Sequence, residues 1–357
     1  MRKIHINASR DYDILIGRNL LPDTGSYLRS VCQPKRVCVI SDDIVFPLYG
    51  ATVAKSLEEA GFEVSQFIFP NGEPSKTLST VSQIFDFLTE KHFTRSDLLV
   101  ALGGGVVGDL AGFAAACYLR GIKFIQIPTT FLAQIDSSVG GKTGVDIPGG
   151  KNLVGAFWQP SLVIIDPCCL DTLPDRTFSD GMAEVIKYGC ILDRELFDLL
   201  DQCGSRTGVM EHIEDVVYTC CDLKRRVVVE DERDTGLRQL LNFGHTIGHA
   251  FELAGHYETW THGQGVAAGM NWAAQLGVGL GVTPPETVEP IQEILKKYDL
   301  PLDIPCPWET MVEAVGLDKK NAGDHISLIV LEKLGQAARR RMARDELLEK
   351  LECMYGR

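Results

Sequence analysis

Histidine and acidic residues in the second half of the chain occur at spacings suited to binding a metal ion. His245 and His249 lie four residues apart in LNFGHTIGHAFELA, and Glu184 and Lys187 lie three apart in GMAEVIKYG, so each pair shares one face of a predicted helix. His262 follows in WTHGQGVAAGM. Imidazoles and a carboxylate are the ligands of a catalytic zinc site that keeps a position open for a substrate oxygen. The spacing favours His245 and His249, with Glu184 or His262 completing the set. Structural histidines and a solvent-exposed Glu-x-x-Lys pair are the alternatives.

A glycine cluster in the first half has the spacing of a dinucleotide-binding turn. Gly103, Gly105 and Gly108 follow the strand-like run DLLVAL and open directly into a helix of small residues. In that context the backbone amides at a helix N-terminus can approach a pyrophosphate, whereas a tight turn with close helix packing is the alternative. The ribose-binding acid that usually follows about 20 residues later is missing. Asp42, after the strand-like run RVCVIS, could replace it or could serve as a helix cap.

The segment 136–160 combines six glycines with two lysines, three hydroxyl residues and an asparagine. We expect a ligand-binding loop between two sheet segments. Lys142, Lys151 and Asn152 offer positive charge and hydrogen-bond donors for a phosphate or another anion, and Asp136 offers a carboxylate. Taken singly, each lysine is more typical of a solvated surface position.

A sheet and a set of helices must position these residues. Short runs rich in Val and Ile alternate with helix-like stretches in the first half, which is typical of a parallel sheet with crossover helices. The runs lie near 36–41, 63–69, 97–103, 123–128 and 162–166. From about residue 176 long helical periodicities replace them, and a turn around Pro174 marks the change. We therefore predict a Rossmann-like α/β domain over residues 1–174 and a mostly helical domain over residues 175–357.

Composition and charge exclude several classes of protein. The 357 residues carry 35 Lys and Arg against 48 Asp and Glu, a net charge of −13, which argues against a nucleic-acid partner. The basic run 339–341 is interpreted as the solvated face of a helix-like C-terminal segment. No apolar stretch approaches the ~20 residues that cross a bilayer, and the start of the chain does not have the pattern of a secretory signal. Eleven cysteines without a Cys-x-x-Cys suggest neither a disulfide framework nor a zinc knuckle. We expect a cytoplasmic protein with no membrane partner.

Long, ordered matches over nearly the whole chain resemble the 3-dehydroquinate synthase family. The matching segments are GEPSKT, GGGVVGDLAGFAA, YLRGI, PTTFLAQIDSSVGGKTGVD, GKNLVGAFWQP, GMAEVIKYG, GLRQLLNFGHTIGHAFE, HGQGVAAGM and DKKN. The resemblance implies an N-terminal nucleotide-binding domain, a helical C-terminal domain, an active site between them, and a homodimer. It also implies that the chain converts 3-deoxy-D-arabino-heptulosonate 7-phosphate to 3-dehydroquinate and inorganic phosphate in the shikimate pathway.

The resemblance assigns a role to each candidate residue. Zinc, or cobalt in the same ligand set, would be held by Glu184, His245 and His262, so that His249 is not a ligand. The implied catalytic residues are Asp136, Lys142, Lys187, Lys224 and His249. The implied substrate-binding residues are Arg120, which reaches the partner subunit's phosphate pocket, Lys142, Asn152, Lys187, Lys224, Arg238, Asn242, His249 and Lys320, with Lys319 as the alternative to Lys320. The implied NAD-binding residues are Asp42, Glu73, Lys76, Gly104, Gly105, Asp109, Thr129, Thr130, Lys142, Lys151 and Thr172.

The implied reaction begins with transient oxidation of the substrate by NAD. The new ketone acidifies the neighbouring proton, phosphate is eliminated with the substrate's own phosphate as base, the hydride returns, and an aldol closure forms the ring. One position departs from the family: Asp234 stands in DERDTGLR where the family has Glu, and its side chain reaches about one methylene less far.

Three other interpretations are weighed against this one. A related cyclase acting on a substrate without a carboxylate would have no use for Lys224, Arg238 and Asn242. A metal-dependent polyol dehydrogenase would release NADH and would need no phosphate-binding lysines. A nucleotide-sensing or scaffold protein would not need an intact Glu184, His245 and His262.

Overall fold

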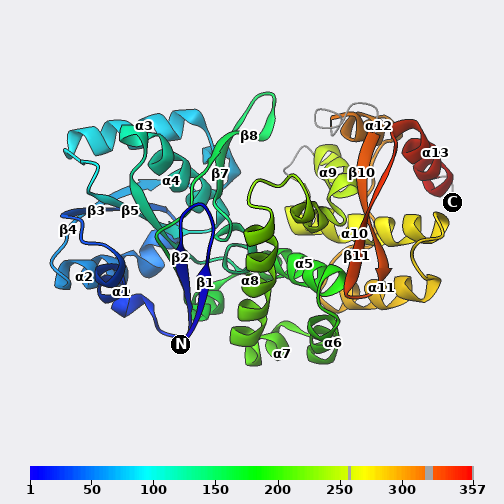
Figure 1. Ribbon diagram of the computed structural model, residues 1–357, viewed down its shortest axis with the longest axis horizontal. Coiled ribbons are helices and arrows are strands. Elements are labelled where there is room, and N and C mark those ends of the chain that lie inside the picture. The colour runs from blue at the N-terminus through cyan, green and yellow to red at the C-terminus, as the bar shows by residue number, and fades with distance from the viewer. Residues whose placement is uncertain (256–258, 318–324, 356–357) are drawn as a thin grey trace. The chain divides into compact units, whose positions relative to one another are not determined.

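The computed structural model describes residues 1–255, 259–317 and 325–355, which fall into two compact units (Figure 1). Unit 1 consists of Met1–Pro174 together with Val217–Arg233, and unit 2 of Asp175–Val216 and Asp234–Arg357. A single boundary after residue 174 therefore does not describe the chain, because residues 217–233 belong to unit 1. These residues pack within unit 1: the Cys221 thiol donates to the Gln134 carbonyl oxygen (3.3 Å), and the Arg2 guanidinium lies 5.2 Å from the centroid of the Tyr218 ring.

Unit 1 is built on a seven-stranded sheet of order β1-β2-β9-β6-β5-β3-β4, in which only the β1–β2 pair is antiparallel. Its strands are β1 (Arg2–Ile6), β2 (Tyr12–Ile16), β3 (Arg36–Asp42), β4 (Glu63–Phe69), β5 (Leu98–Gly103), β6 (Lys123–Pro128) and β9 (Leu162–Ile165). Its helices are α1 (Thr24–Val31), α2 (Ala51–Glu59), α3 (Leu78–Glu90) and α4 (Gly105–Cys117). Each predicted Val- and Ile-rich run forms a strand, and the α/β fold class is confirmed.

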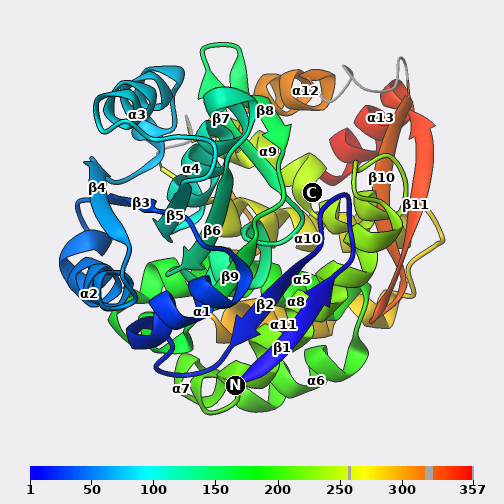
Figure 2. The same ribbon diagram turned by 60° about the vertical axis from the view of Figure 1, so that its left-hand side comes forward.

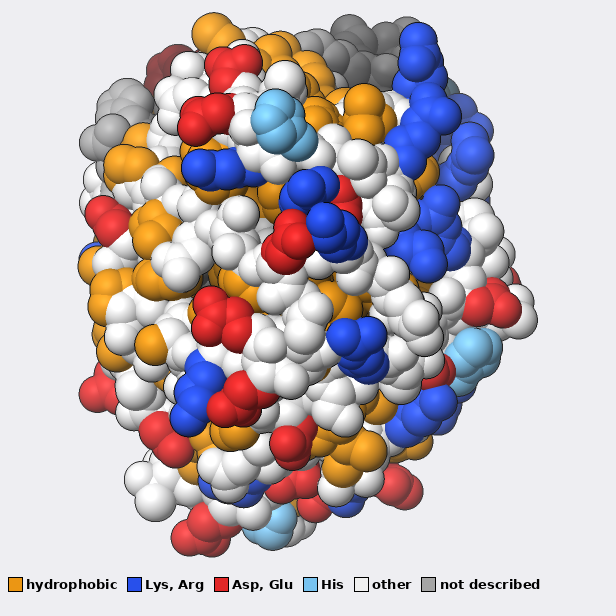
Figure 3. All heavy atoms as spheres, turned by 90° about the vertical axis from the view of Figure 1, so that its left-hand side faces the viewer, with side chains coloured by type: hydrophobic (Ala, Val, Ile, Leu, Met, Phe, Trp, Pro, Cys, Tyr) orange, Lys and Arg blue, Asp and Glu red, His pale blue; other side chains and the backbone are white. Residues whose placement is uncertain are grey.

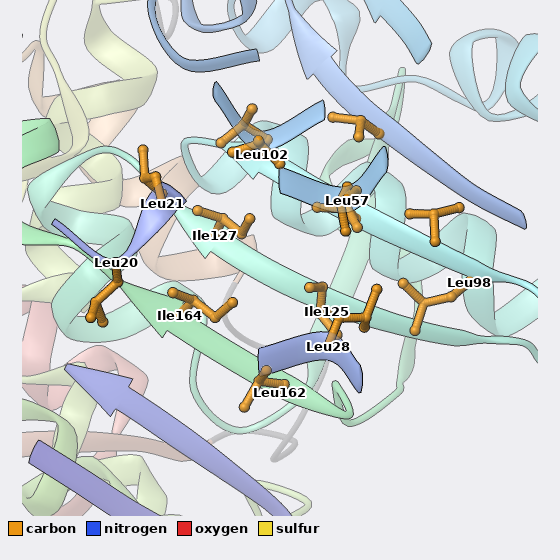
Figure 4. Packing of buried hydrophobic residues seen from close by; sticks show 14 of the residues in the cluster. Leu20, Leu21, Leu28, Leu57, Leu98, Leu102, Ile125, Ile127, Leu162 and Ile164 are labelled. Carbon is orange, nitrogen blue, oxygen red and sulfur yellow. The ribbon is translucent and has the colours of Figure 1, made fainter. Parts of the chain in front are cut away.

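Helices cover both faces of this sheet because alternate strand residues point to opposite sides. On one face α1 and α2 pack on residues such as Val39, Ile125 and Ile127 (Figure 4). On the other face α3 and α4 pack on Ile40 and Leu99. Figure 2 shows these two pairs of helices on either side of the strands. The central strands are thus buried on both faces, which explains why they read as continuous apolar runs.

The expected loop over residues 136–160 is largely a β-hairpin. Its strands are β7 (Lys142–Ile147) and β8 (Gly150–Phe157), which form a two-stranded sheet, and Asp146 of β7 also makes an isolated parallel bridge with Thr77. A Cβ on Gly144 would meet the Val154 carbonyl oxygen at 2.7 Å, and one on Gly155 would meet the Thr143 carbonyl oxygen at 2.2 Å. These glycines permit the close approach of the two strands and do not mark a loop.

Unit 2 is mostly helical. Its helices are α5 (Asp175–Ile191), α6 (Arg194–Cys203), α7 (Arg206–Glu211), the first part of α8 (Ile213–Glu230), α9 (His245–Ala254), α10 (His262–Gly279), α11 (Val288–Lys297), α12 (Trp308–Leu317) and α13 (Arg344–Tyr355). A hairpin of β10 (His325–Lys333) and β11 (Gln336–Ala343) completes it. Among the described residues, no helix combines the length and apolar character needed to span a membrane.

The helical interpretation of the basic run 339–341 is wrong, because Arg339, Arg340 and Arg341 lie in β11. Alanine and arginine favour helices, but Gly335 adopts a positive φ of 83° and turns the chain back onto the β-branched residues of β10. Pairing with β10 thus overrides local propensity. All three arginines are exposed. On the face of the molecule shown in Figure 3, acidic and basic side chains are interspersed, and Lys and Arg gather along one edge.

The buried core of unit 1 makes a testable contribution to stability. Ile125→Ala removes a fully buried side chain from β6, so we expect it to lower the free energy of unfolding by about 2–5 kcal/mol. Ile68→Ala, on the edge strand β4 where the side chain is 44% exposed, should cost about 1 kcal/mol or less. Urea unfolding followed by circular dichroism measures both. Equal losses for the two variants would contradict the assigned burial.

Candidate active site

Three potential metal ligands converge in unit 2. Glu184 on α5, His245 at the start of α9 and His262 at the start of α10 each place one ligand atom within 4.8 Å of the others. The Nε2 atoms of both histidines lie 3.4 Å from Glu184 Oε1. His249 is not in this group: its exposed ring lies 5.7 Å from the His245 ring, centroid to centroid. Spacing was wrong about His249, which both suggested sets contained, because the packing of three helices brings Glu184 and His262 together beside His245; this is the set that the family resemblance implies.

Local sequence places each histidine at a helix start. Thr261 caps α10: its hydroxyl accepts from the Gln264 amide, while the Gln264 side chain accepts from the Thr261 amide. This capping box fixes His262 as the first residue of α10. Gly244, with a positive φ of 81°, precedes α9 and turns the chain so that His245 is its first residue.

Three glycines allow α5, α9 and α10 to pack close together. A Cβ on Gly248 of α9 would lie 2.8 Å from the Gly265 carbonyl oxygen of α10, and one on Gly269 would lie 2.0 Å from the Gly244 carbonyl oxygen. A Cβ on Gly263 would lie 2.2 Å from the carbonyl oxygen of Asp180 on α5. The three helices can approach this closely only because no side chain stands between them.

Both histidines are oriented through their other ring nitrogen. His245 Nδ1 lies 3.2 Å from the Phe243 carbonyl oxygen, and His262 Nδ1 lies 3.4 Å from Glu252 Oε2. Such partners fix the ring so that Nε2 is presented to a metal. Glu252 is buried and was missed by sequence reasoning, although an acid among apolar residues in HAFELA, seven positions after His245, is a signal that could have found it.

The cluster is strongly coupled electrostatically. Burial lowers the pKa of His245 to about 3, although Glu184 opposes the shift. Burial also disfavours charge on His262, but hydrogen bonds to Glu184 and Glu252 outweigh it and raise its pKa well above the usual value. The Lys187 ammonium, almost fully buried, pairs with Glu184 Oε2. A carboxylate and two oriented imidazoles form a donor set that fits zinc or cobalt.

In unit 1 the candidate dinucleotide residues lie at the point where the strand order reverses. From β3 the chain passes to β4 on one side, and β5 lies on the other, so the carboxyl ends of β3 and β5 flank the position where such sheets bind ligands. Asp42 ends β3, and Gly104 and Gly105 begin α4, whose N-terminus has no side-chain cap. Uncapped amides at this point suit a pyrophosphate.

The tight-turn interpretation accounts for two glycines of the cluster. A Cβ on Gly103 would lie 2.4 Å from the Val107 side chain, and one on Gly108 would lie 2.8 Å from Gln126 Oε1 on β6, so these two glycines permit a tight turn and close packing. Asp42 likewise acts as a cap, because its Oδ1 accepts from the Ile44 and Val45 amides at 3.0 and 2.8 Å.

The other candidate NAD residues of unit 1 include two ion pairs and three threonines. Buried Lys76 pairs with Asp109 on α4, its Nζ 2.7 Å from Oδ2, and Lys151 Nζ lies 3.8 Å from Glu73 Oε1. Burial raises the pKa of Asp109 even though Lys76 opposes it. The hydroxyls of Thr130 and Thr172 contact the Ala133 amide and the Tyr49 hydroxyl, respectively. Thr129 Oγ1 is buried and has no hydrogen-bond partner among the described residues.

The candidate substrate residues are divided between the units. In unit 1, Lys224 of α8 is buried, and its Nζ lies 2.6 Å from both the Oδ1 and the carbonyl oxygen of Asp136. Arg120, Lys142 and Asn152 are exposed. In unit 2, Lys187 and Arg238 are buried, whereas Asn242 and His249 are exposed. Lys319 and Lys320 lie outside the described residues.

The departure at Asp234 has a backbone explanation. Asp234 has a positive φ of 61°, in the left-handed region. Aspartate enters this region more readily than most residues because its short polar side chain can hydrogen-bond locally. The shorter acid therefore suits the backbone conformation found here.

Comparison with known proteins places the chain in a family. The models for the N-terminal and C-terminal parts of 3-dehydroquinate synthase match residues 66–180 and 181–321. The 3-dehydroquinate synthase of Streptococcus suis (strain 05ZYH33) is 48% identical over 98% of this chain and 99% of its own.

Two solved structures are similar over almost the whole length. A 2-deoxy-scyllo-inosose synthase, complexed with carbaglucose-6-phosphate, NAD⁺ and Co²⁺, has a TM-score of 0.87 at 29% identity and 98% coverage of both chains. The 2-epi-5-epi-valiolone synthase from Streptomyces hygroscopicus subsp. jinggangensis 5008, with NAD⁺ and Zn²⁺ bound, has a TM-score of 0.88 at 26% identity, covering 100% of this chain and 99% of its own. With both family models and a full-length relative agreeing, the chain belongs to the 3-dehydroquinate synthase family.

Proposed function

We propose that the chain is a lyase that converts 3-deoxy-D-arabino-heptulosonate 7-phosphate to 3-dehydroquinate and inorganic phosphate. Family membership over nearly the whole chain supports this activity. The structural observation that carries it is the group formed by Glu184, His245 and His262, with both imidazoles oriented through Nδ1. This group gives a metal-dependent cyclase the ligands that it needs.

NAD and a divalent ion, zinc or cobalt, are the proposed cofactors, and the cofactors of the two solved cyclases support them. When bound, the metal ion lowers the pKa of contacting hydroxyls, and NAD accepts a hydride and later returns it. Glu184, His245 and His262 would hold the ion. The amides at the start of α4, at Gly104 and Gly105, would bind the NAD phosphates.

The cationic residues of this acidic chain are proposed to bind a substrate that carries both a phosphate and a carboxylate. We assign Lys142, Asn152, Lys187 and His249 to the phosphate, and the buried Lys224 and Arg238, with Asn242, to the carboxylate. Lys224 also contacts Asp136. This contact would hold the Asp136 carboxylate in place for hydrogen bonds to the reacting hydroxyls of the substrate.

A homodimer is also proposed, with Arg120 reaching the phosphate pocket of the partner subunit. Arg120 and Leu119 both have positive φ values, of 66° and 50°, in an exposed turn, and strained backbone of this kind persists where a side chain must be aimed. An odd number of cysteines, several of them buried thiols such as Cys38 and Cys190, supports a reducing compartment and hence the cytoplasm.

The proposed reaction consumes no NAD. With zinc, catalytic NAD and the heptulosonate phosphate, the purified protein should release inorganic phosphate without net formation of NADH. A phosphate assay and the absorbance of NADH measure the two products together. Steady accumulation of NADH would instead indicate a dehydrogenase.

Loss of the acidic ligand should abolish metal binding. Glu184→Gln should raise the dissociation constant for zinc by about 100-fold or more, since even changes to residues behind the ligands cost about 10–100-fold. Because this variant leaves buried Lys187 beside a neutral amide, His262→Ala serves as a second test. Competition with a chromophoric chelator measures affinity, and circular dichroism checks folding. Glu211→Gln, an exposed acid in unit 2, is the control. Unchanged affinity in both ligand variants would refute the site.

Lys142 is proposed to bind the substrate phosphate. Lys142→Ala should raise the KM for the heptulosonate phosphate by about ten-fold or more, because hydrogen bonds between charged groups contribute about 1.5–3 kcal/mol. The dissociation constant for NAD should change by less than about three-fold. Lys55→Ala, also exposed, is the matched control. Equal effects on substrate and NAD would assign Lys142 to the cofactor instead.

A further inference from the structure

A closed ring of contacts in unit 1 is centred on Asp146, a half-buried residue of β7 to which neither the sequence nor the comparisons assign a role. Its backbone amide donates to the Lys76 carbonyl oxygen (2.8 Å), and its side-chain Oδ1 accepts from the Asn152 amide (2.7 Å). Lys76 Nζ in turn donates to Asn152 Oδ1 (2.6 Å). Three segments, around residues 76, 146 and 152, are thereby tied to one another.

Asp146 lies opposite an irregularity in the β7–β8 hairpin. Val145 pairs with Val154, and Ile147 pairs with Gly150, so Asp146 alone faces the three residues 151–153. Bulges of this kind redirect side chains and are common beside active sites. The bulge carries Lys151 and Asn152, both of them candidate ligand residues.

The backbone of Asn152 adopts a left-handed conformation that a hydrogen bond stabilises. Its φ is 54°, in the left-handed region, which asparagine adopts more readily than most residues. The bond from its amide to Asp146 Oδ1 holds this conformation. Asp146 is thus the side chain that fixes the main chain at the bulge.

Lys76 completes the arrangement by orienting the side-chain carboxamide of Asn152. An ammonium group can only donate, so its contact with Asn152 must involve the Oδ1 end. The Nδ2 end, which carries two N–H donors, is then the end that Asn152 can offer to an anion. Lys76 is itself held by Asp109, 2.7 Å away on α4.

We propose that Asp146 is a positioning residue for phosphate recognition. Asp146 fixes the backbone of Asn152 at the bulge, and Lys76 can then turn the Nδ2 donors of the Asn152 side chain toward the substrate phosphate. Asp146 does not itself touch the substrate. This inference rests on the proposed function, which assigns Asn152 to the phosphate.

Two substitutions separate the hydrogen bond from the charge. Asp146→Ala removes the acceptor, and we expect the KM for the heptulosonate phosphate to rise about ten-fold, with kcat and the NAD dissociation constant changing less than about three-fold. Asp146→Asn keeps an oxygen acceptor for the Asn152 amide and should restore KM to within about three-fold of the unsubstituted protein. Glu90→Ala, an exposed acid on α3, is the control. Equal rises in KM and in the NAD dissociation constant, or no rescue by Asn, would overturn the proposal.

A double-substitution cycle tests whether Asp146 acts through Asn152. In an Asn152→Ala background, Asp146→Ala should raise KM by less than about two-fold, because the donor that it positions is already gone. Full additivity of the two effects would contradict the proposal.

Hydrogen exchange measured by mass spectrometry tests the mechanical link without reference to activity. A peptide spanning residues 148–157 should exchange faster in Asp146→Ala than in the unsubstituted protein and should keep its protection in Asp146→Asn. Unchanged exchange in Asp146→Ala would overturn the inference. Because this arm needs no turnover, it separates failure of the Asp146 inference from failure of the proposed function.

Discussion

The candidate chemistry depends on the close packing of α5, α9 and α10 in unit 2. Gly248, Gly263 and Gly269 stand where a Cβ would collide with a neighbouring backbone. Because they have no Cβ, the N-termini of α9 and α10 can lie close to the side of α5. Glu184, His245 and His262 project from that junction. A buried carboxylate is costly unless it is paired, and Glu184 pairs with the Lys187 ammonium. A divalent cation fits the donor types of the cluster.

Unit 1 presents backbone donors and fixed polar side chains at one edge of its sheet. The reversal of strand order between β3 and β5 places Asp42 and the uncapped start of α4 at that edge. The β7–β8 hairpin is attached through Lys76 and Asp146, so that Asn152 shares contacts with a candidate NAD residue. The residues proposed to bind dinucleotide and those proposed to bind phosphate therefore share contacts within this unit.

Sequence patterns predicted best what depends on burial and local spacing. The strands of unit 1 were found because a parallel sheet buries both faces and leaves continuous apolar runs. Spacing alone favoured His249 as a ligand and was wrong, since the relation of each histidine to Glu184 depends on how three helices pack; the family resemblance implied His262 instead. The strand β11 was missed because its alanines and arginines favour a helix, and only pairing with β10 decides otherwise. Glu252 and Asp146 were missed because their roles lie in contacts between distant segments.

The identity of the atoms around a bound metal tests the central claim most directly. X-ray absorption spectroscopy of the zinc-loaded protein should show a first shell of nitrogen and oxygen at about 2.0–2.2 Å, with the outer scattering of two imidazole rings. Eleven cysteines offer a real alternative. A thiolate sulfur at about 2.3 Å, or an all-oxygen shell without imidazole scattering, would contradict the assignment of Glu184, His245 and His262.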